Sequence, residues 1–144
     1  MIDLDNQTSL TITLPALEKI ASVLSTQEVE LLIVDDATMH ALNLAHRDKA
    51  CTTDVLSFPL DSACMEDTKT MPLGSIVIAA SYVISKAKHY GHTEQDELSL
   101  LFIHGMLHLL GYDHEIDRGE MRHKEEALIK LFHLPKSLIV RTAH

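Results

Sequence analysis

The chain has 144 residues, 46% of them hydrophobic, which is enough apolar material for one folded core, so we expect a single domain over residues 1–144. The formal net charge of −9 argues against a protein that binds nucleic acid through a broad basic surface, although most of the excess acid precedes residue 47 and residues 47–92 are neutral. The sequence shows no signal peptide, no membrane-spanning run and no dense or metal-spaced cysteines, so we expect a cytoplasmic protein without membrane contact.

The first third of the chain has the apolar pattern of a β-α-β-α segment. We predict an opening strand near residues 2–13, a helix from Leu14 to Leu24, a short strand from Glu30 to Val34, and a second helix from Ala37 to Ala45. Asp35 and Asp36 precede this second helix, where a carboxylate can accept hydrogen bonds from free backbone N–H groups.

The remaining elements are two strands followed by three helices. The strands run from Val55 to Phe58 and from Gly74 to Ala79, both rich in branched apolar residues. Because Pro59 has no N–H to donate, the first of them is predicted at a sheet edge. Helical patterns then cover Ser81 to Tyr90, Thr93 to Leu110, and Asp117 to Phe132. We therefore predict an α+β fold, a single domain with a small mixed sheet of about four strands packed by helices.

Three histidines near the end of the long helix are spaced as metal ligands. His104 and His108 lie one helical turn apart, so their rings can share one cation. On a continuing helix His114 would lie roughly 240° around the axis and about 9 Å further along, out of reach of that cation. Gly111 lies where a helix can end in the left-handed conformation and let the chain fold back. The pattern predicts one Zn²⁺ ion bound by the helix and by the turn after it.

Three protein ligands favour a catalytic zinc site, because the fourth position then stays open to water or substrate. Packed histidines without metal are the alternative, which the third histidine and the turn glycine make weaker. The ligand spacing matches the protease pattern H-E-x-x-H-x-x-G-x-x-H, but Gly105 stands where those proteases carry their glutamate base. Glycine inside a helix costs roughly 1 kcal/mol relative to alanine, so Gly105 predicts close approach of another element or of substrate.

Three further residues are candidates whose roles the sequence leaves open. Asp54 precedes the edge strand and either caps it or takes part in chemistry, while the strand itself either receives an extended substrate or only contributes to the core. Arg47 either binds phosphate or is ordinary surface charge. Asp113 either accepts the second N–H of a zinc-bound histidine or caps the turn.

Taken together, these segments resemble the YbeY family of bacterial proteins over roughly residues 30–130. The histidine motif is the most specific part of the match, because it combines protease-like ligand spacing with the missing glutamate. His46 and Ser75 depart from the family, which usually has an aromatic residue and an acid at these positions. The matching segments are Leu42-Asn43 with Arg47, Thr53 to Pro59, Leu73-Gly74 with Ile76 to Ile78, and His104 to His114.

The resemblance implies a zinc-dependent, single-strand-specific endoribonuclease that acts in ribosomal RNA maturation and ribosome quality control. It makes His104, His108 and His114 the zinc ligands and Arg47 the cleft arginine associated with activity, and we take Asp54 as a second candidate catalytic residue. The implied partners are a single-stranded ribosomal RNA precursor and a ribosome or ribosome-associated protein. A chain of charge −9 is expected to depend on such a protein for targeting.

Three functions from different classes follow from these residues. The favoured one is RNA phosphodiester cleavage, in which zinc polarises a phosphoryl oxygen or activates water and Arg47 neutralises phosphate charge. The second is a non-catalytic, zinc-binding ribosome assembly factor whose metal ties the turn to the helix. The third is a peptidase-like hydrolase, which would need an outside base such as Asp54 or a residue of the C-terminal helix.

Overall fold

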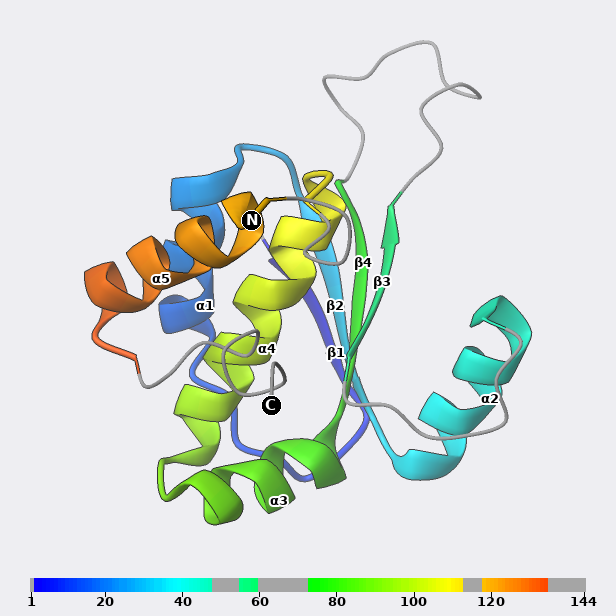
Figure 1. Cartoon of the computed structure of the whole chain (residues 1–144). Coiled ribbons are helices and arrows are strands. Elements are labelled where there is room, and N and C mark those ends of the chain that lie inside the picture. Colours follow the sequence, from blue (N-terminus) through cyan, green and yellow to red (C-terminus); the bar gives the residue numbers. More distant parts are fainter. Residues whose placement is uncertain (1, 48–54, 60–72, 113–117, 135–144) are drawn as a thin grey trace, which may run out of the picture.

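A computed structural model of the chain describes residues 2–47, 55–59, 73–112 and 118–134, which form an α+β fold (Figure 1). The elements, in chain order, are β1 (Ile2–Asn6), α1 (Leu14–Leu24), β2 (Val29–Val34), α2 (Asp36–Arg47), β3 (Val55–Pro59), β4 (Gly74–Ala79), α3 (Ala80–Tyr90), α4 (Glu94–Leu109) and α5 (Glu120–Phe132). Among these described elements, none is a helix long and apolar enough to cross a membrane.

The sheet is mixed, with four strands in the order β1-β2-β4-β3 among the described residues. β1, β2 and β4 are parallel, whereas β3 runs antiparallel to β4, with Val55 opposite Ile78 and Pro59 opposite Gly74. β3 therefore lies at an edge, as Pro59 predicts, because a proline is tolerated where no neighbouring strand needs its N–H. The central strand β4 is buried at every position except Ser75, as expected for a strand covered on both faces.

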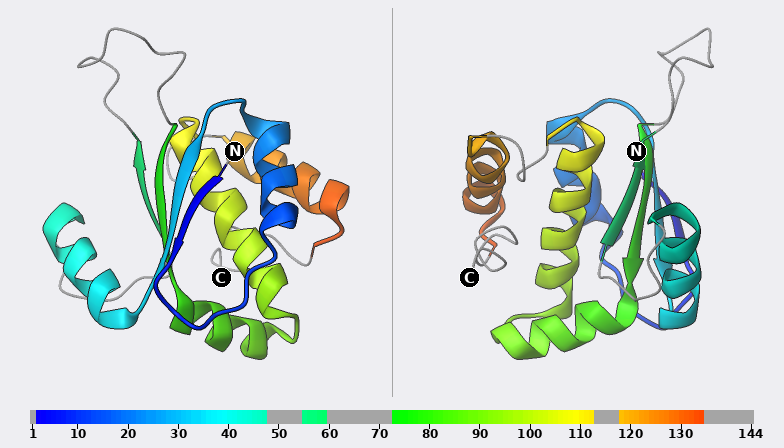
Figure 2. Two further views of the ribbon diagram at one scale, coloured as in Figure 1. Left: turned by 180° about the vertical axis from the view of Figure 1, so that it is seen from behind. Right: turned by 45° about the vertical axis from the view of Figure 1, so that its right-hand side comes forward.

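Helices cover the two faces of the sheet unequally (Figure 2). On one face α4 lies against β3 and β4, with α1 and α3 in contact with it, and α5 packs on its outer side. The apolar side chains between this face and its helices form the main core. α2 packs against β4 on the opposite face, over a smaller core of Val34, Met39, Val77 and Ala79. α4 is thus enclosed between the sheet and α5.

Two predicted elements are shorter in the structure, for local reasons. The opening strand ends at Asn6, because the Asn6 side chain forms a turn: its carbonyl oxygen accepts the N–H of Thr8 and its amide donates to the Leu10 carbonyl. The last helix begins at Glu120, because Gly119 before it has a φ of 102°, outside the helical region. The other predicted elements match the structure to within a few residues.

Candidate metal centre

α4 carries the candidate site and is the most enclosed helix of the described structure. Its first turn is capped by Thr93, whose hydroxyl oxygen accepts the N–H of Asp96 at 3.0 Å, and its early acidic residues complement the helix dipole. Twelve of its sixteen residues are buried, so the helix is surrounded on nearly all sides. Side chains on its C-terminal half are therefore held by packing rather than by solvent-exposed contacts.

His104 and His108 face each other on α4, as their four-residue spacing predicts. Their Nε2 atoms are 3.1 Å apart, and their rings meet edge to face with centroids 4.7 Å apart. His104 is buried, with 9% of its surface exposed, and His108 is half-buried. The two nitrogens that could bind a cation thus converge at the margin of the core.

This donor pair fits a shared zinc ion. Zn–N bonds of about 2.0–2.1 Å and tetrahedral angles place two ligand nitrogens about 3.3 Å apart, close to the separation observed. A direct hydrogen bond between the rings, with one Nε2 as donor, would give a similar distance. Zinc binding by both rings therefore remains a prediction, and the observed distance is consistent with it.

α4 ends in the turn that the sequence predicts at Gly111. Gly111 has a φ of 98°, its N–H bonds the His108 carbonyl, and the N–H of Tyr112 bonds the Leu107 carbonyl. These two bonds form the Schellman arrangement, which reverses the chain direction after a helix. His114 and Asp113 lie outside the described residues, within which no set of three metal-binding side chains comes together. The described part of the chain therefore holds two of the three predicted ligands.

A residue that the sequence analysis missed, Glu125 of α5, contacts the site directly. Its side chain is fully buried, and its Oε2 lies 3.3 Å from Nδ1 of His104. The contact joins residues 21 positions apart, so no local pattern reveals it. The sequence does show that Glu125 is unusual, because it is an acid at a position of α5 that faces the core, but it does not show which residue Glu125 contacts.

Gly105 is where α4 comes closest to the sheet. A Cβ atom at this position would lie 2.9 Å from Cγ2 of Ile76 on β4, well inside van der Waals contact. Because Ile76 is itself fully buried, it has little room to move away. This contact explains the glycine between the two histidines, and it leaves no space for the glutamate that proteases carry there.

The two predicted catalytic residues are placed only in part. Arg47 is the last residue of α2, and its side chain is outside what the structure describes. α2 packs against β4 on the face of the sheet opposite α4, so the helix that ends at Arg47 and the histidines lie on different faces of the sheet. Asp54 lies outside the described residues, but β3, which follows it, does contact α4, as expected for an edge strand near the site.

Comparison with known proteins relates the whole chain to one group. The family model "Endoribonuclease YbeY" matches residues 2–133. A protein of that name from Sulfurovum sp. is 57% identical, with 98% of this chain and 97% of the relative covered. Another from Sulfurimonas denitrificans is 53% identical, with 99% of each chain covered. A third, from Campylobacter jejuni, is 56% identical over 88% of this chain and 90% of its own.

The fold also has a solved counterpart. The solution structure of a Thermotoga maritima protein matches 92% of this chain and 89% of its own, with a TM-score of 0.61 and 26% sequence identity. This likeness supports the α+β arrangement that the strand order and layers show.

Proposed function

Because the chain belongs to the family of the endoribonuclease YbeY, we propose that it cleaves single-stranded RNA at a zinc ion held by His104, His108 and His114. Membership in this family makes the chain an RNA-cleaving hydrolase. The zinc ion, the preference for single strands and the ribosomal role are our proposals beyond that membership.

The convergence of the two Nε2 atoms at 3.1 Å is the observation that carries the proposal. Two imidazoles presenting the same nitrogen to one point, at the margin of an apolar core, form a donor pair for a borderline-soft cation such as zinc. The turn at Gly111 supports His114 as the third ligand, because it directs the chain back after the helix.

The proposed division of labour follows from the chemistry of each side chain. The three histidines bind and orient one zinc ion, which when bound supplies Lewis-acid chemistry at a phosphate group. The Arg47 guanidinium binds and neutralises the phosphate, and the Asp54 carboxylate accepts a proton. RNA carries its own 2′-hydroxyl nucleophile, so the reaction does not require a glutamate at position 105.

The peptidase alternative is disfavoured by the contact of Gly105 with Ile76. A protease of the H-E-x-x-H kind carries its glutamate base on the residue after the first histidine. In this chain that residue is Gly105, and the space that a side chain would need there is occupied by Ile76 of the sheet. A structural zinc ion that takes no part in cleavage remains the competing role for the metal, because a metal joining α4 to the following turn would have the same two-histidine geometry.

The deciding experiment compares the wild type with His114→Ala, purified in parallel. Metal content is measured by elemental analysis, and both proteins are incubated with labelled single-stranded and duplex RNA. We expect stoichiometric zinc and single-strand cleavage in the wild type, and loss of both in the variant. Bound zinc in the wild type, with cleavage equal to that of the zinc-free variant, would favour a structural zinc ion and contradict zinc-dependent cleavage.

Arg47→Ala separates phosphate binding from metal binding. We expect this variant to keep its zinc and to lose about 10²-fold or more in turnover, the usual effect of removing one transition-state donor. Loss of zinc from this variant would contradict the role proposed for Arg47.

We propose that the physiological substrate is a ribosomal RNA precursor and that a ribosome or ribosome-associated protein delivers the enzyme to it. The net charge of −9 supports this dependence, since phosphate binding by an isolated protein normally relies on many basic side chains. Tight, strongly salt-dependent binding of RNA by the isolated chain would contradict it.

A further inference from the structure

Glu125 occupies a position where its helix would normally carry an apolar side chain. The buried residues of α5 are Met121, Glu125 and Leu128, spaced by four and three, so they form one stripe on the helix, and α5 packs against α4. Removing an ionised carboxylate from water costs several kcal/mol unless partners compensate. A fully buried acid in this stripe therefore indicates a function that an apolar side chain cannot provide.

The contact that Glu125 makes selects one form of the His104 ring. Nδ1 of His104 lies 3.3 Å from Glu125 Oε2, and when the carboxylate is ionised it can only accept, so Nδ1 is then the ring nitrogen that carries the hydrogen. In a neutral imidazole the lone pair then resides on Nε2. That atom is the one that faces Nε2 of His108, whereas the other tautomer would direct a hydrogen toward the cation.

We propose that Glu125 is a positioning residue, which holds His104 in the tautomer and orientation that allow Nε2 to bind the metal. The inference rests on the proposed function, because it presupposes zinc at the histidines. Carboxylates that accept the second N–H of a metal-bound histidine raise its basicity, and their loss typically weakens metal affinity by about 10–100-fold. α5 thereby contributes to the site without providing a ligand.

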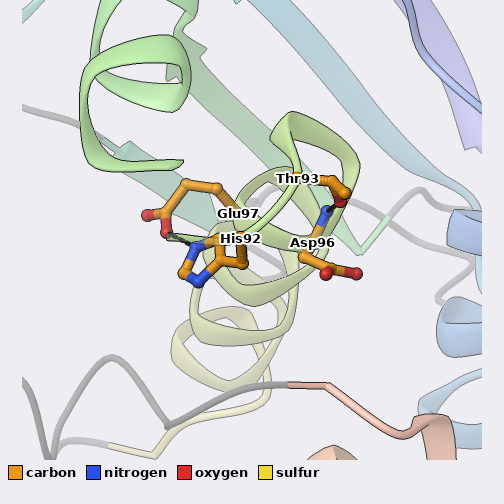
Figure 3. A network of polar contacts seen from close by, with 4 residues as sticks. All are labelled: His92, Thr93, Asp96 and Glu97. Atoms are coloured by element: carbon orange, nitrogen blue, oxygen red, sulfur yellow. Dashed lines mark hydrogen bonds and ion pairs between the residues drawn. The ribbon is translucent and has the colours of Figure 1, made fainter. Parts of the chain in front are cut away.

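Glu97 of α4 offers a matched control. His92, which is half-buried, and the buried Glu97 form a second pair at the beginning of α4, with His92 Nε2 2.7 Å from Glu97 Oε1 (Figure 3). Glu97 is as fully buried as Glu125, but it lies at the opposite end of α4 from His108. Replacing it disturbs a histidine–glutamate pair of the same chemistry while leaving the candidate site unchanged.

The test measures zinc affinity separately from stability in wild type, Glu125→Gln, Glu125→Met and Glu97→Gln. Affinity is obtained by competition with a chromophoric chelator, and stability by thermal unfolding of the metal-free proteins. We expect Glu125→Met to bind zinc about 10–100-fold more weakly. Glu125→Gln should lose less, because its amide oxygen still accepts the Nδ1 hydrogen. Glu97→Gln should unfold at a lower temperature and bind zinc with wild-type affinity.

If Glu125 served only the fold, both Glu125 variants would be less stable without metal, but the folded variants would bind zinc with wild-type affinity. Removing one partner of a buried pair leaves the other unpaired, so metal-free Glu125→Met is expected to lose some stability under either role, and the zinc affinity distinguishes the two roles. Nitrogen–proton correlation spectra of the imidazoles should show His104 as the Nδ1–H tautomer in metal-free wild type, and as a mixture of tautomers in Glu125→Met. Glu125→Gln provides the same comparison if the methionine variant does not fold.

Unchanged zinc affinity in both Glu125 variants, with stoichiometric zinc in the wild type, would overturn the inference and leave the proposed function intact. Equal losses of affinity in the Glu125 and Glu97 variants would also overturn it, because the effect would then be a general loss of helix order. A wild-type protein that binds no zinc would overturn both the inference and the zinc-dependent function.

Discussion

Gly105 links the packing of a single residue to the chemistry that the site can perform. The residue lies between two candidate ligands, in the interior of a helix, where glycine costs roughly 1 kcal/mol relative to alanine. The close packing of α4 on the sheet offsets this cost and requires a glycine, since a Cβ atom there would lie 2.9 Å from Ile76 of β4. The glycine brings α4 close to the sheet, and the same contact excludes a glutamate base.

We predict that Gly105→Ala destabilises the protein by about 1–3 kcal/mol, the usual range for overpacking a well-filled core, despite the better helix propensity of alanine. Urea denaturation measures the difference in the free energy of unfolding. The control is the same substitution in an Ile76→Ala background, where the space is open and alanine should be neutral or stabilising. Equal destabilisation in both backgrounds would show that the contact with Ile76 is not the cause.

Among the helices, α3 and α4 end in the same way and offer a matched pair. Gly91 after α3 has a φ of 71° and Gly111 after α4 a φ of 98°, and an added Cβ would meet nothing within 4 Å at either position. Only backbone strain therefore opposes a side chain at these two glycines. The two turns differ in that the one at Gly111 leads toward His114.

We predict that Gly91→Ala and Gly111→Ala each destabilise the metal-free protein by about 1–2 kcal/mol, the cost of a left-handed conformation for a residue with a side chain. Only Gly111→Ala should also weaken zinc binding, because relaxation of its turn displaces the third ligand. Urea denaturation and chelator competition measure the two effects. Wild-type zinc affinity in Gly111→Ala would argue against a ligand contributed by the chain after the turn.

The beginning of α2 makes stability depend on pH through Asp35. The N–H of Thr38 donates to Asp35 Oδ1 at 2.8 Å, and this bond, together with one from the Thr38 hydroxyl, lowers the pKa of Asp35 below its ordinary value of 3.8. A pKa lower in the folded than in the unfolded state means that the ionised form stabilises the fold. This contribution is complete above about pH 3.8 and is lost as the pH falls through the lowered value.

We predict that wild type and Asp35→Asn differ in stability by an amount that shrinks as the pH falls. Asparagine is an equally good cap but has no charge to lose, so it serves as the non-titrating control. Urea midpoints of both proteins between about pH 5 and about pH 2.5 measure the effect. A difference that stays constant over this range would contradict the role of the Asp35 charge.

The candidate metal centre joins parts of the chain that have little else in common. His104 and His108 belong to the central helix, Glu125 belongs to the helix outside it, and the predicted third ligand follows the turn between them. A ligand that binds only the folded state stabilises all of these contacts together. Metal binding and global stability should therefore be linked.

We predict that free zinc at 100 times its dissociation constant raises the free energy of unfolding by about 2.7 kcal/mol. Thermal unfolding with zinc and with excess chelator measures the change, and His114→Ala provides the control that should not respond. An equal zinc effect in wild type and His114→Ala would assign the stabilisation to another site.

The features that depend on local geometry could be predicted from the amino-acid sequence. The pairing of His104 with His108, the reversal at Gly111 and the edge position of Pro59 each follow from helical periodicity, the conformational freedom of glycine or the missing N–H of proline. These rules act within a few residues, so they are visible before any folding is known. The mixed sheet of about four strands follows from the same kind of pattern.

The contacts between distant residues could not be predicted in this way, because they depend on how the folded layers pack. The fold brings Glu125 to His104 across 21 residues, sets Ile76 against Gly105, and places the helix ending at Arg47 on the face of the sheet opposite the histidines. These contacts depend on which stripe each helix buries and against what, and burial is a property of the assembled layers. The spacing of His104 and His108 is a feature of one helix, whereas the residues that surround and orient them come from distant parts of the chain.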